Sequence, residues 1–247
     1  MTELKKLIDI DDNWYLRLKN TIESDEFLSL GKFVAQERAT KQIYPYQSEV
    51  FRVFKDLSFN DVKIVLIGQD PYHNLYQGEP VACGYSFAPR NREYMPPSLK
   101  QIYKALKKDL YDEIPIFESD LDISKWVEQG VMLLNMGLTV EKGKPGSHLK
   151  EWEFFTKKVI ESFNSTSGII FMLWGKYAQS MRPLINEDLN YVLECSHPAS
   201  AIYSGTEWTC SNFRKANEIL YGNHRDQINW LDIEQMSSQN ELTKLIN

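Results

Sequence analysis

Residues 62–73 read Val62-Lys63-Ile64-Val65-Leu66-Ile67-Gly68-Gln69-Asp70-Pro71-Tyr72-His73, an apolar run followed at once by polar and aromatic side chains. The apolar part is short, rich in β-branched residues and stopped by a glycine, which predicts a buried strand. In open α/β sheets, ligands bind beyond the carboxyl ends of the strands. We therefore expect Asp70 to lie where chemistry takes place. The simpler alternative is an ordinary turn, because Asp-Pro pairs are common in turns.

Two other apolar runs also end in polar side chains. Residues 131–134 lead into Asn135, and residues 191–195 lead into Ser196 and His197, whereas a further run at 168–174 ends without a reactive group. A lone Asn or His at a strand end is usually a turn or capping residue. Three strands that deliver an acid, an amide and an imidazole instead predict a site for a planar polar ligand on which charge develops.

Helical patterns fill the segments between these strands. Apolar residues recur at helical spacing over 99–110 and 152–163, residues 1–42 look helical in part, and a helix is expected to begin at Tyr44-Pro45-Tyr46-Gln47. Ser98 with Gln101 three residues later is a capping-box signature, so Ser98 is predicted to be an N-cap. Helices that alternate with apolar strands imply an α/β fold, with a mostly parallel four-stranded sheet between helices on both faces.

Length and composition favour one domain. The 247 residues are 43% hydrophobic, which is enough for one substantial core, and no repeat or Pro/Gly-rich linker divides them. We expect residues 1–247 to form a single domain, with 1–42 as a helical N-terminal segment and 232–247 as a polar tail. No apolar stretch approaches the roughly 20 residues that span a bilayer, and no secretory signal follows Met1, which predicts a cytoplasmic protein without a membrane partner.

The cysteine content also favours a cytoplasmic protein. Cys83, Cys195 and Cys210 are few, odd in number and not spaced as C-x-x-C. This pattern favours a reducing compartment and gives no sign of a metal site, an iron–sulfur cluster or another cofactor.

Net charge is the feature that argues against a nucleic-acid partner. The chain has 28 basic and 34 acidic residues, whereas nucleic-acid binders usually carry a basic footprint. Acidic residues gather at 9–12, 109–122 and 232–241, while basic residues lie near the predicted site: Lys142, Lys144, Lys150, Lys176, Arg214 and Lys215. Whole-chain charge does not determine the local field, so we expect a basic face on an acidic body. An ordinary solvated surface is the alternative for any single lysine.

Four segments, taken in order, resemble one known family. Residues 68–73, 133–135, 173–178 and 197–200 are similar to the motifs of the uracil-DNA glycosylases of the large family-1 type, and weaker similarities extend the match from about Ile43 to Trp230. The resemblance implies a base-excision repair enzyme that flips uracil out of DNA and hydrolyses the N-glycosidic bond, leaving an abasic site. It also implies a monomer without a cofactor, whose partners are single- or double-stranded DNA containing uracil and proteinaceous inhibitors that mimic uracil or DNA.

The same resemblance assigns the chemistry to two residues. Asp70 would lie beneath the sugar, where a carboxylate stabilises positive charge and orients a water molecule. His197 would donate a hydrogen bond to the uracil oxygen on which negative charge grows, a task for which a neutral imidazole suffices.

Recognition of the base is assigned to four further residues. Asn135 has a donor and an acceptor, so it can bond N3–H and O4 of uracil while mismatching cytosine. Tyr72 would press on the C5 edge, where thymine carries a methyl group. The Gln69 backbone would hold the base edge, and Phe87 would stack on the flipped base.

The chain departs from the family pattern in two places. Residues 74–83 form a longer segment than usual between His73 and Phe87, and Cys83 stands about where a histidine is usual. After His197 the family supplies a leucine that enters the duplex, whereas the register here gives Ala201, which is too small, with Ile202 or Tyr203 as replacements. The expected DNA contacts are Pro97, Ser98, Ser200, Ala201 and Ile202.

Two other functions stay open at this point. One is an inactive DNA-binding scaffold of the same fold, which the presence of Asp70, Asn135 and His197 disfavours. The other is a glycosylase for a different damaged base, which Tyr72 together with Asn135 disfavours.

Overall fold

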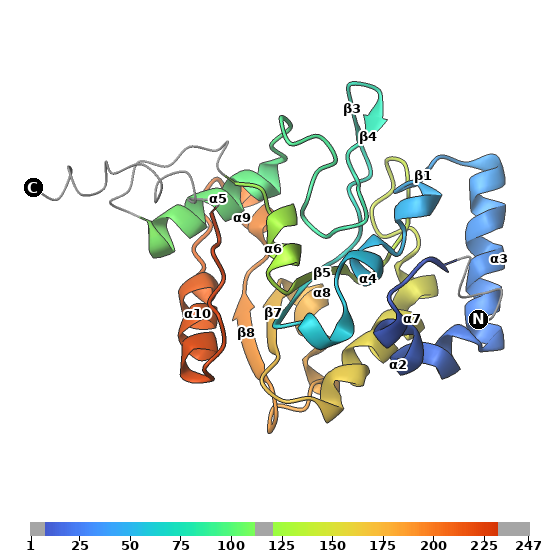
Figure 1. Cartoon of the computed structure of the whole chain (residues 1–247). Helices are drawn as coiled ribbons and strands as arrows, with labels where there is room; N and C mark the ends of the chain where they lie inside the picture. Colours follow the sequence, from blue (N-terminus) through green and yellow to red (C-terminus); the bar gives the residue numbers. More distant parts are fainter. Residues whose placement is uncertain (1–7, 112–120, 232–247) are drawn as a thin grey trace, which may run out of the picture.

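A four-stranded parallel sheet forms the centre of the computed structural model, which describes residues 8–111 and 121–231 (Figure 1). The strand order is β5-β2-β7-β8. The strands are β2 (Ile64–Gly68), β5 (Val131–Asn135), β7 (Ile170–Trp174) and β8 (Tyr191–Cys195). The α/β class and the parallel sheet predicted from the sequence are thus confirmed, whereas the predicted polar tail at 232–247 lies outside the described residues.

The register makes the strands end level with one another. Gly68 pairs with Asn135 across β2 and β5, and Trp174 pairs with Cys195 across β7 and β8. Every residue of β2, β5 and β7 is buried, as expected for strands covered on both faces. The polar residues that follow these strands therefore emerge side by side at one edge of the sheet.

The larger helices form two groups around the sheet (Figure 1). In one group, α2 (Asp12–Ile22), α3 (Asp25–Thr40) and α7 (Leu149–Glu161) pack on one another. In the other, α5 (Pro97–Leu110) packs on both α9 (Pro198–Ser204) and α10 (Asn212–Gly222). Helices α4 (Arg52–Asp56) and α6 (Ser124–Glu128) pack on each other and on β5, and α8 (Lys176–Gln179) follows β7.

Short elements complete the fold. Two small antiparallel pairs join β1 (Ile43–Tyr44) to β6 (Val140–Glu141), and β3 (Leu75–Tyr76) to β4 (Glu79–Pro80). Single turns of 3-10 helix are η1 (Gln47–Glu49), η2 (Phe59–Asp61), η4 (Ser162–Ser165) and η5 (Arg182–Leu184). None of the helices in the described ranges is long and apolar enough to cross a membrane.

Within residues 8–42, α2 and α3 confirm the predicted helical segment. A side-chain cap marks the start of each helix. Asp11 accepts a hydrogen bond from the Asn13 backbone, and Ser24 accepts one from Phe27.

Two local predictions were wrong. Ser98 is not an N-cap, since α5 begins at Pro97, whose fixed φ and missing N–H suit a first helical position. The helix expected over Tyr44-Pro45-Tyr46-Gln47 begins only at the last of these residues, because Tyr44 belongs to β1 and helical turns start at Gln47.

Candidate active site

A pocket of about 350 Å³ opens at the carboxyl edge of the sheet. Its walls come from the segments after β2, β5, β7 and β8, together with the start of α5 and the turn before α7. It brings together all six residues predicted to bind the base or take part in the chemistry: Gln69, Asp70, Tyr72, Phe87, Asn135 and His197. The convergence expected from three strand ends is thus present in the fold.

Asp70 is held by donors on both carboxylate oxygens. The Gly146 backbone N–H donates to Oδ2, and the Gln69 side-chain amide donates to Oδ1 at 3.0 Å. Burial raises the pKa of this carboxyl, and these hydrogen bonds offset part of that rise. A half-buried carboxylate with fixed orientation interacts strongly with positive charge that develops above it.

Gln69 also helps to fix the neighbouring segment. Its backbone oxygen accepts a hydrogen bond from Gly137 at 2.9 Å, and the Gly68 oxygen accepts one from Met136 at 2.9 Å. These bonds continue the pairing of β2 with β5 past the strand ends. The positions of Asp70 and Asn135 are therefore fixed relative to each other.

Asn135 is a buried polar residue of the site. Its side chain is only 4% exposed, at the last position of β5, and it faces the pocket. Among the described residues, none forms a hydrogen bond with its amide, which leaves a donor and an acceptor at the pocket for a ligand. Gly68 makes room for it, because a Cβ added there would lie 2.5 Å from Asn135 Oδ1.

His197 is held in one tautomer by the helix that it caps. Its Nδ1 accepts a hydrogen bond from the Ala199 backbone N–H at 3.1 Å, so the ring proton of the neutral imidazole lies on Nε2. Burial lowers the pKa of this ring, which keeps it neutral to lower pH than an exposed histidine. The site thus presents a neutral N–H donor, which suits a base oxygen that gains negative charge.

Tyr72 is locked in place by its hydroxyl group. It donates to the Phe87 backbone oxygen at 2.9 Å and lies 3.0 Å from Ser98 Oγ. Desolvation strongly raises the pKa of Tyr72, so the phenol stays protonated. Phe87 has a positive φ of 61°, and its ring lies 5.9 Å from the His197 ring and 5.5 Å from that of Trp174.

The expected DNA-contacting residues divide into two groups. Ser98 lines the pocket, Pro97 is exposed at the start of α5, and Ser200 and Ile202 are exposed on α9. Ala201 is only 4% exposed and packs into the core, which contradicts its placement as the residue that enters the duplex. Tyr203, one of the two alternatives, is 90% exposed and lines the pocket.

The helical phase explains why Ala201 is buried. Ala199 and Tyr203 are four residues apart in α9 and both line the pocket, so they share one face of the helix. Ala201 lies between them in sequence and therefore points away. Trp208, also near this segment, is buried against Trp174 with ring centroids 4.9 Å apart.

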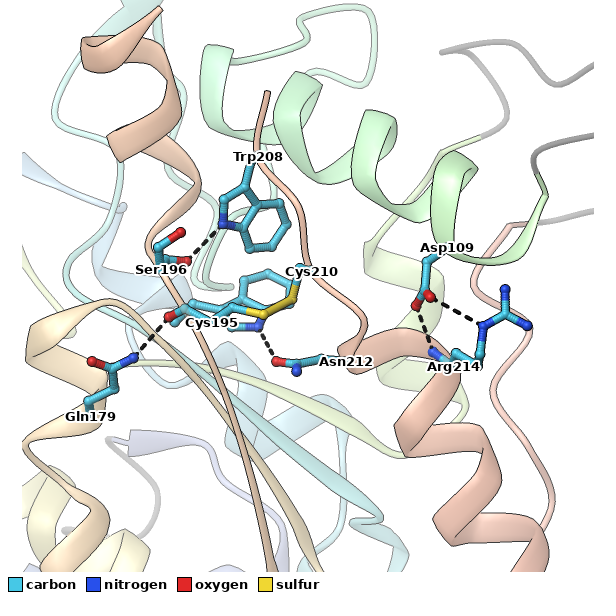
Figure 2. Close-up of a disulfide and its surroundings, with 9 residues drawn as sticks. Asp109, Gln179, Cys195, Ser196, Trp208, Cys210, Asn212 and Arg214 are labelled. Carbon is cyan, nitrogen blue, oxygen red and sulfur yellow. Dashed lines mark hydrogen bonds and ion pairs between the residues drawn. A yellow bond between two sulfur atoms is a disulfide. The ribbon is translucent and has the colours of Figure 1, made fainter. Parts of the chain in front are cut away.

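A disulfide closes the segment that carries His197 and α9 (Figure 2). It joins Cys195 at the end of β8 to Cys210 before α10, with Cα atoms 6.0 Å apart, a pairing that the few cysteines and the expected reducing compartment did not predict. The pairing follows from the fold, because the chain leaves β8 and returns beside it. Cys83 is free and buried.

Hydrogen bonds reinforce this closed segment (Figure 2). The Trp208 indole donates to the Ser196 oxygen at 2.8 Å, and Gln179 donates to the Cys195 oxygen at 3.0 Å. The two residues before His197 are thus tied to α8 and to the segment between α9 and α10.

Sequence reasoning missed the turn formed by residues 142–148. Gly146 supplies the backbone donor to Asp70, and Pro145 lines the pocket beside it. The turn is anchored by Thr139 Oγ1, which lies 2.8 Å from His148 Nδ1 and accepts from the Trp152 indole at 2.7 Å. The Gly-Lys-Pro-Gly sequence at 143–146 is typical of a turn, but it does not show that this turn contacts Asp70.

The predicted basic face is only partly present. Lys176 lines the pocket, and Lys142 and Lys144 belong to the turn beside it, although Lys144 pairs with Glu141 at 2.7 Å. Arg214 lies on α10, which contributes no lining residue, and its guanidinium pairs with Asp109 at 3.3 Å. Positive charge at the site therefore comes from the turn and from α8.

Comparison with known proteins gives a consistent result. Residues 54–221 match the model of the uracil DNA glycosylase superfamily. A uracil-DNA glycosylase of Coxiella burnetii is 41% identical over 91% of this chain and 96% of its own length. One of Clostridioides difficile is 37% identical over 91% of this chain and 98% of its own.

Solved structures agree with these relatives. The crystal structure of mimivirus uracil-DNA glycosylase superposes with a TM-score of 0.81 at 25% identity, covering 91% of this chain and 88% of that one. A mimivirus variant in complex with UGI gives the same TM-score, covering 91% and 90% of the two chains.

Proposed function

The chain belongs to the uracil-DNA glycosylase superfamily, and from that premise we propose that it flips uracil out of DNA and hydrolyses its N-glycosidic bond, releasing free uracil. The observation that carries the proposal is the meeting of Asp70, Asn135 and His197 in one pocket. Its volume of about 350 Å³ falls within the range of small-molecule sites, about 300–1,000 Å³.

Bond cleavage separates charge, and the pocket has a group for each sign. Positive charge on the sugar is stabilised by the Asp70 carboxylate, which also orients the attacking water molecule. Negative charge on the departing base is stabilised by the Nε2–H of His197. Both groups are oriented before the substrate arrives, so little reorganisation is needed in the transition state.

Selection for uracil uses shape and hydrogen bonding together. The Asn135 amide matches N3–H and O4 of uracil, and its burial makes a mismatched base costly. The Tyr72 ring, fixed by its contacts with Phe87 and Ser98, rejects the thymine methyl group. Phe87 stacks on the base, and the Gln69 backbone holds its edge.

We also propose that the whole chain acts as one domain, as a monomer in the cytoplasm. The DNA contacts assigned to Pro97, Ser98, Ser200 and Ile202 belong to the same proposal, with Tyr203 in place of Ala201. A proteinaceous inhibitor that mimics DNA would bind over the same pocket, as suggested by the structural neighbour in complex with UGI.

The test is release of free uracil from single- and double-stranded oligonucleotides. Wild type should release it, and Asp70→Asn should bind the DNA but lose turnover by orders of magnitude, because the carboxylate acts mainly on the transition state. Asp61→Asn, at an exposed position in η2, is the matched control and should behave as wild type.

The same assay separates the two alternatives. Binding without release of any base by wild type would indicate an inactive scaffold. Release of another damaged base but not uracil would indicate a different glycosylase. Asn135→Asp should gain activity on cytosine, because a carboxylate accepts from the cytosine amino group.

A further inference from the structure

The longer segment after His73 folds into a hairpin that projects from the body of the protein (Figure 1). It pairs β3 with β4, and its two turn residues, Gln77 and Gly78, have φ values of 51° and 85°. Such a pair of positive φ values is typical of a tight two-residue hairpin turn. The Val81 N–H closes the base of the hairpin by donating to the Asn74 oxygen at 3.1 Å.

The hairpin presents a stacked pair of tyrosines. The rings of Tyr76 and Tyr94 have centroids 4.5 Å apart and planes 21° apart. Asn74 donates a hydrogen bond to the Tyr94 hydroxyl at 3.4 Å, which ties the second ring to the base of the hairpin. Both tyrosines are partly exposed, so the pair is preformed without being enclosed in the core.

The pair stands between two segments that line the pocket. Tyr76 comes three residues after His73, and Tyr94 comes four residues before Ser98, and both of those residues line the pocket. Three residues span at most about 11 Å, while one DNA strand advances about 3.4 Å per nucleotide. The tyrosine pair is therefore within a few nucleotides of a base held in the pocket.

We propose that the Tyr76–Tyr94 pair is a stacking platform for a base of the substrate strand close to the uracil. The proposal rests on the proposed function, because it assumes that the pocket holds uracil in DNA. Aromatic rings bind bases with little sequence preference, since every base has a π face. A pair that is already stacked loses little side-chain freedom on binding, unlike a single exposed tyrosine.

Another tyrosine near the hairpin, Tyr46, already has partners for both its ring and its hydroxyl group. The Arg90 guanidinium lies 4.6 Å from the Tyr46 ring centroid, and the Tyr46 hydroxyl bonds Glu79 at 2.7 Å. Tyr46 therefore serves to brace the hairpin through Glu79. Because the Tyr46 ring and hydroxyl are already occupied, the Tyr76–Tyr94 pair is the better platform for stacking a base.

The experiment uses single-stranded oligonucleotides with one uracil and one abasic analogue, which is moved through each flanking position in turn. KM and kcat are measured for wild type, Tyr76→Ala, Tyr76→Trp and the control Tyr221→Ala. Tyr221 is 75% exposed on α10, which contributes no residue to the pocket.

For wild type we expect KM to rise about 5- to 150-fold when the abasic analogue occupies one particular position, as for loss of one base–aromatic stack. Tyr76→Ala should show that higher KM on the intact strand, with kcat unchanged and no further loss at that position. Tyr76→Trp should behave as wild type, because it keeps the stacking surface.

The proposal is overturned if Tyr76→Ala keeps the wild-type KM, or if the position-specific loss persists in the variant. A lower melting temperature of Tyr76→Ala would point to folding, and Tyr94→Ala then provides the second test. If wild type releases no uracil, the proposed function fails instead. Binding of the same oligonucleotide series to Asp70→Asn still decides whether the platform exists.

Discussion

The floor of the pocket and its rim are held in different ways. On the floor, Asp70, Asn135 and His197 come from the ends of three parallel strands of one sheet and are fixed by strand register and backbone donors. On the rim, α9 and the β3–β4 hairpin project side chains into solvent, such as Tyr203, which is 90% exposed. The difference suggests a division of labour, in which the floor determines the rate of bond cleavage and the rim determines how DNA is held and opened.

The largest effect is expected on the floor. His197→Asn should lower turnover by about 10²- to 10³-fold, as for removal of one preorganised donor, while DNA binding is retained. Asparagine is a good N-cap, so the start of α9 should be preserved. Single-turnover kinetics with a binding measurement on the same variant provide the check. Near wild-type turnover would remove His197 from the chemistry.

A substitution on the wall of the pocket should change which base is accepted. Tyr72→Ala should raise thymine release by about 10- to 200-fold, the range over which pockets discriminate one methyl group. Tyr72→Phe keeps the ring but loses the hydrogen bond to the Phe87 oxygen, and it should stay selective for uracil. Thymine release at background level from Tyr72→Ala, with uracil release retained, would contradict this role.

A rim substitution should separate duplex from single-stranded DNA. Tyr203→Ala should lower duplex activity by about tenfold, because nothing then fills the stack that the flipped base has left. Single-stranded substrate has little stacking to break, so its rate should hardly change. Competition between the two substrates in one reaction measures the ratio directly. Equal losses on both substrates would assign Tyr203 to general binding.

The pH dependence of kcat should depend on the floor residues Asp70 and His197 and not on the rim. Burial raises the pKa of Asp70 above its ordinary 3.8 and lowers that of His197 below its ordinary 6.5. In the proposed roles, activity requires the Asp70 carboxylate and the neutral His197 imidazole. As pH falls, protonation of either group should remove activity, so kcat should decline by about tenfold per pH unit where one group titrates and more steeply where both do. The acidic limb should survive in His197→Asn, and its disappearance would reassign it to the histidine.

The smallest effect concerns stability. Ala201→Leu should lower the free energy of unfolding by about 1–3 kcal/mol, because the added carbons have no room in a packed interface. Ile202→Ala, at a position that is 40% exposed, should change stability by less than about 0.5 kcal/mol. Denaturant melts of the two variants make the comparison. A stable Ala201→Leu protein with improved duplex activity would restore Ala201 to the wedge position.

The sequence predicted the floor well because each strand end is a local pattern, an apolar run followed by a polar residue. Sequence reasoning failed for features that depend on contacts between segments far apart in the chain. The Gly146 donor to Asp70 is 76 residues away from its acceptor, and the pairing of Cys195 with Cys210 depends on the chain returning beside β8. The family motif aligned Ala201 with the leucine that enters the duplex. Only the helical phase of α9 shows that the Ala201 side chain points into the core.

The level strand ends limit how this protein can change by insertion or deletion. One residue advances a strand by about 3.3 Å and turns its side chain to the opposite face. An insertion or deletion within β2 or β5 would therefore separate Gly68 from Asn135 and move Asn135 away from Asp70. Past Asp70 and His197, which follow the ends of β2 and β8, the strand register imposes no such constraint. The extra residues after His73 and the altered motif after His197 both lie there, where length and sequence can vary while the spacing of the reacting groups is kept.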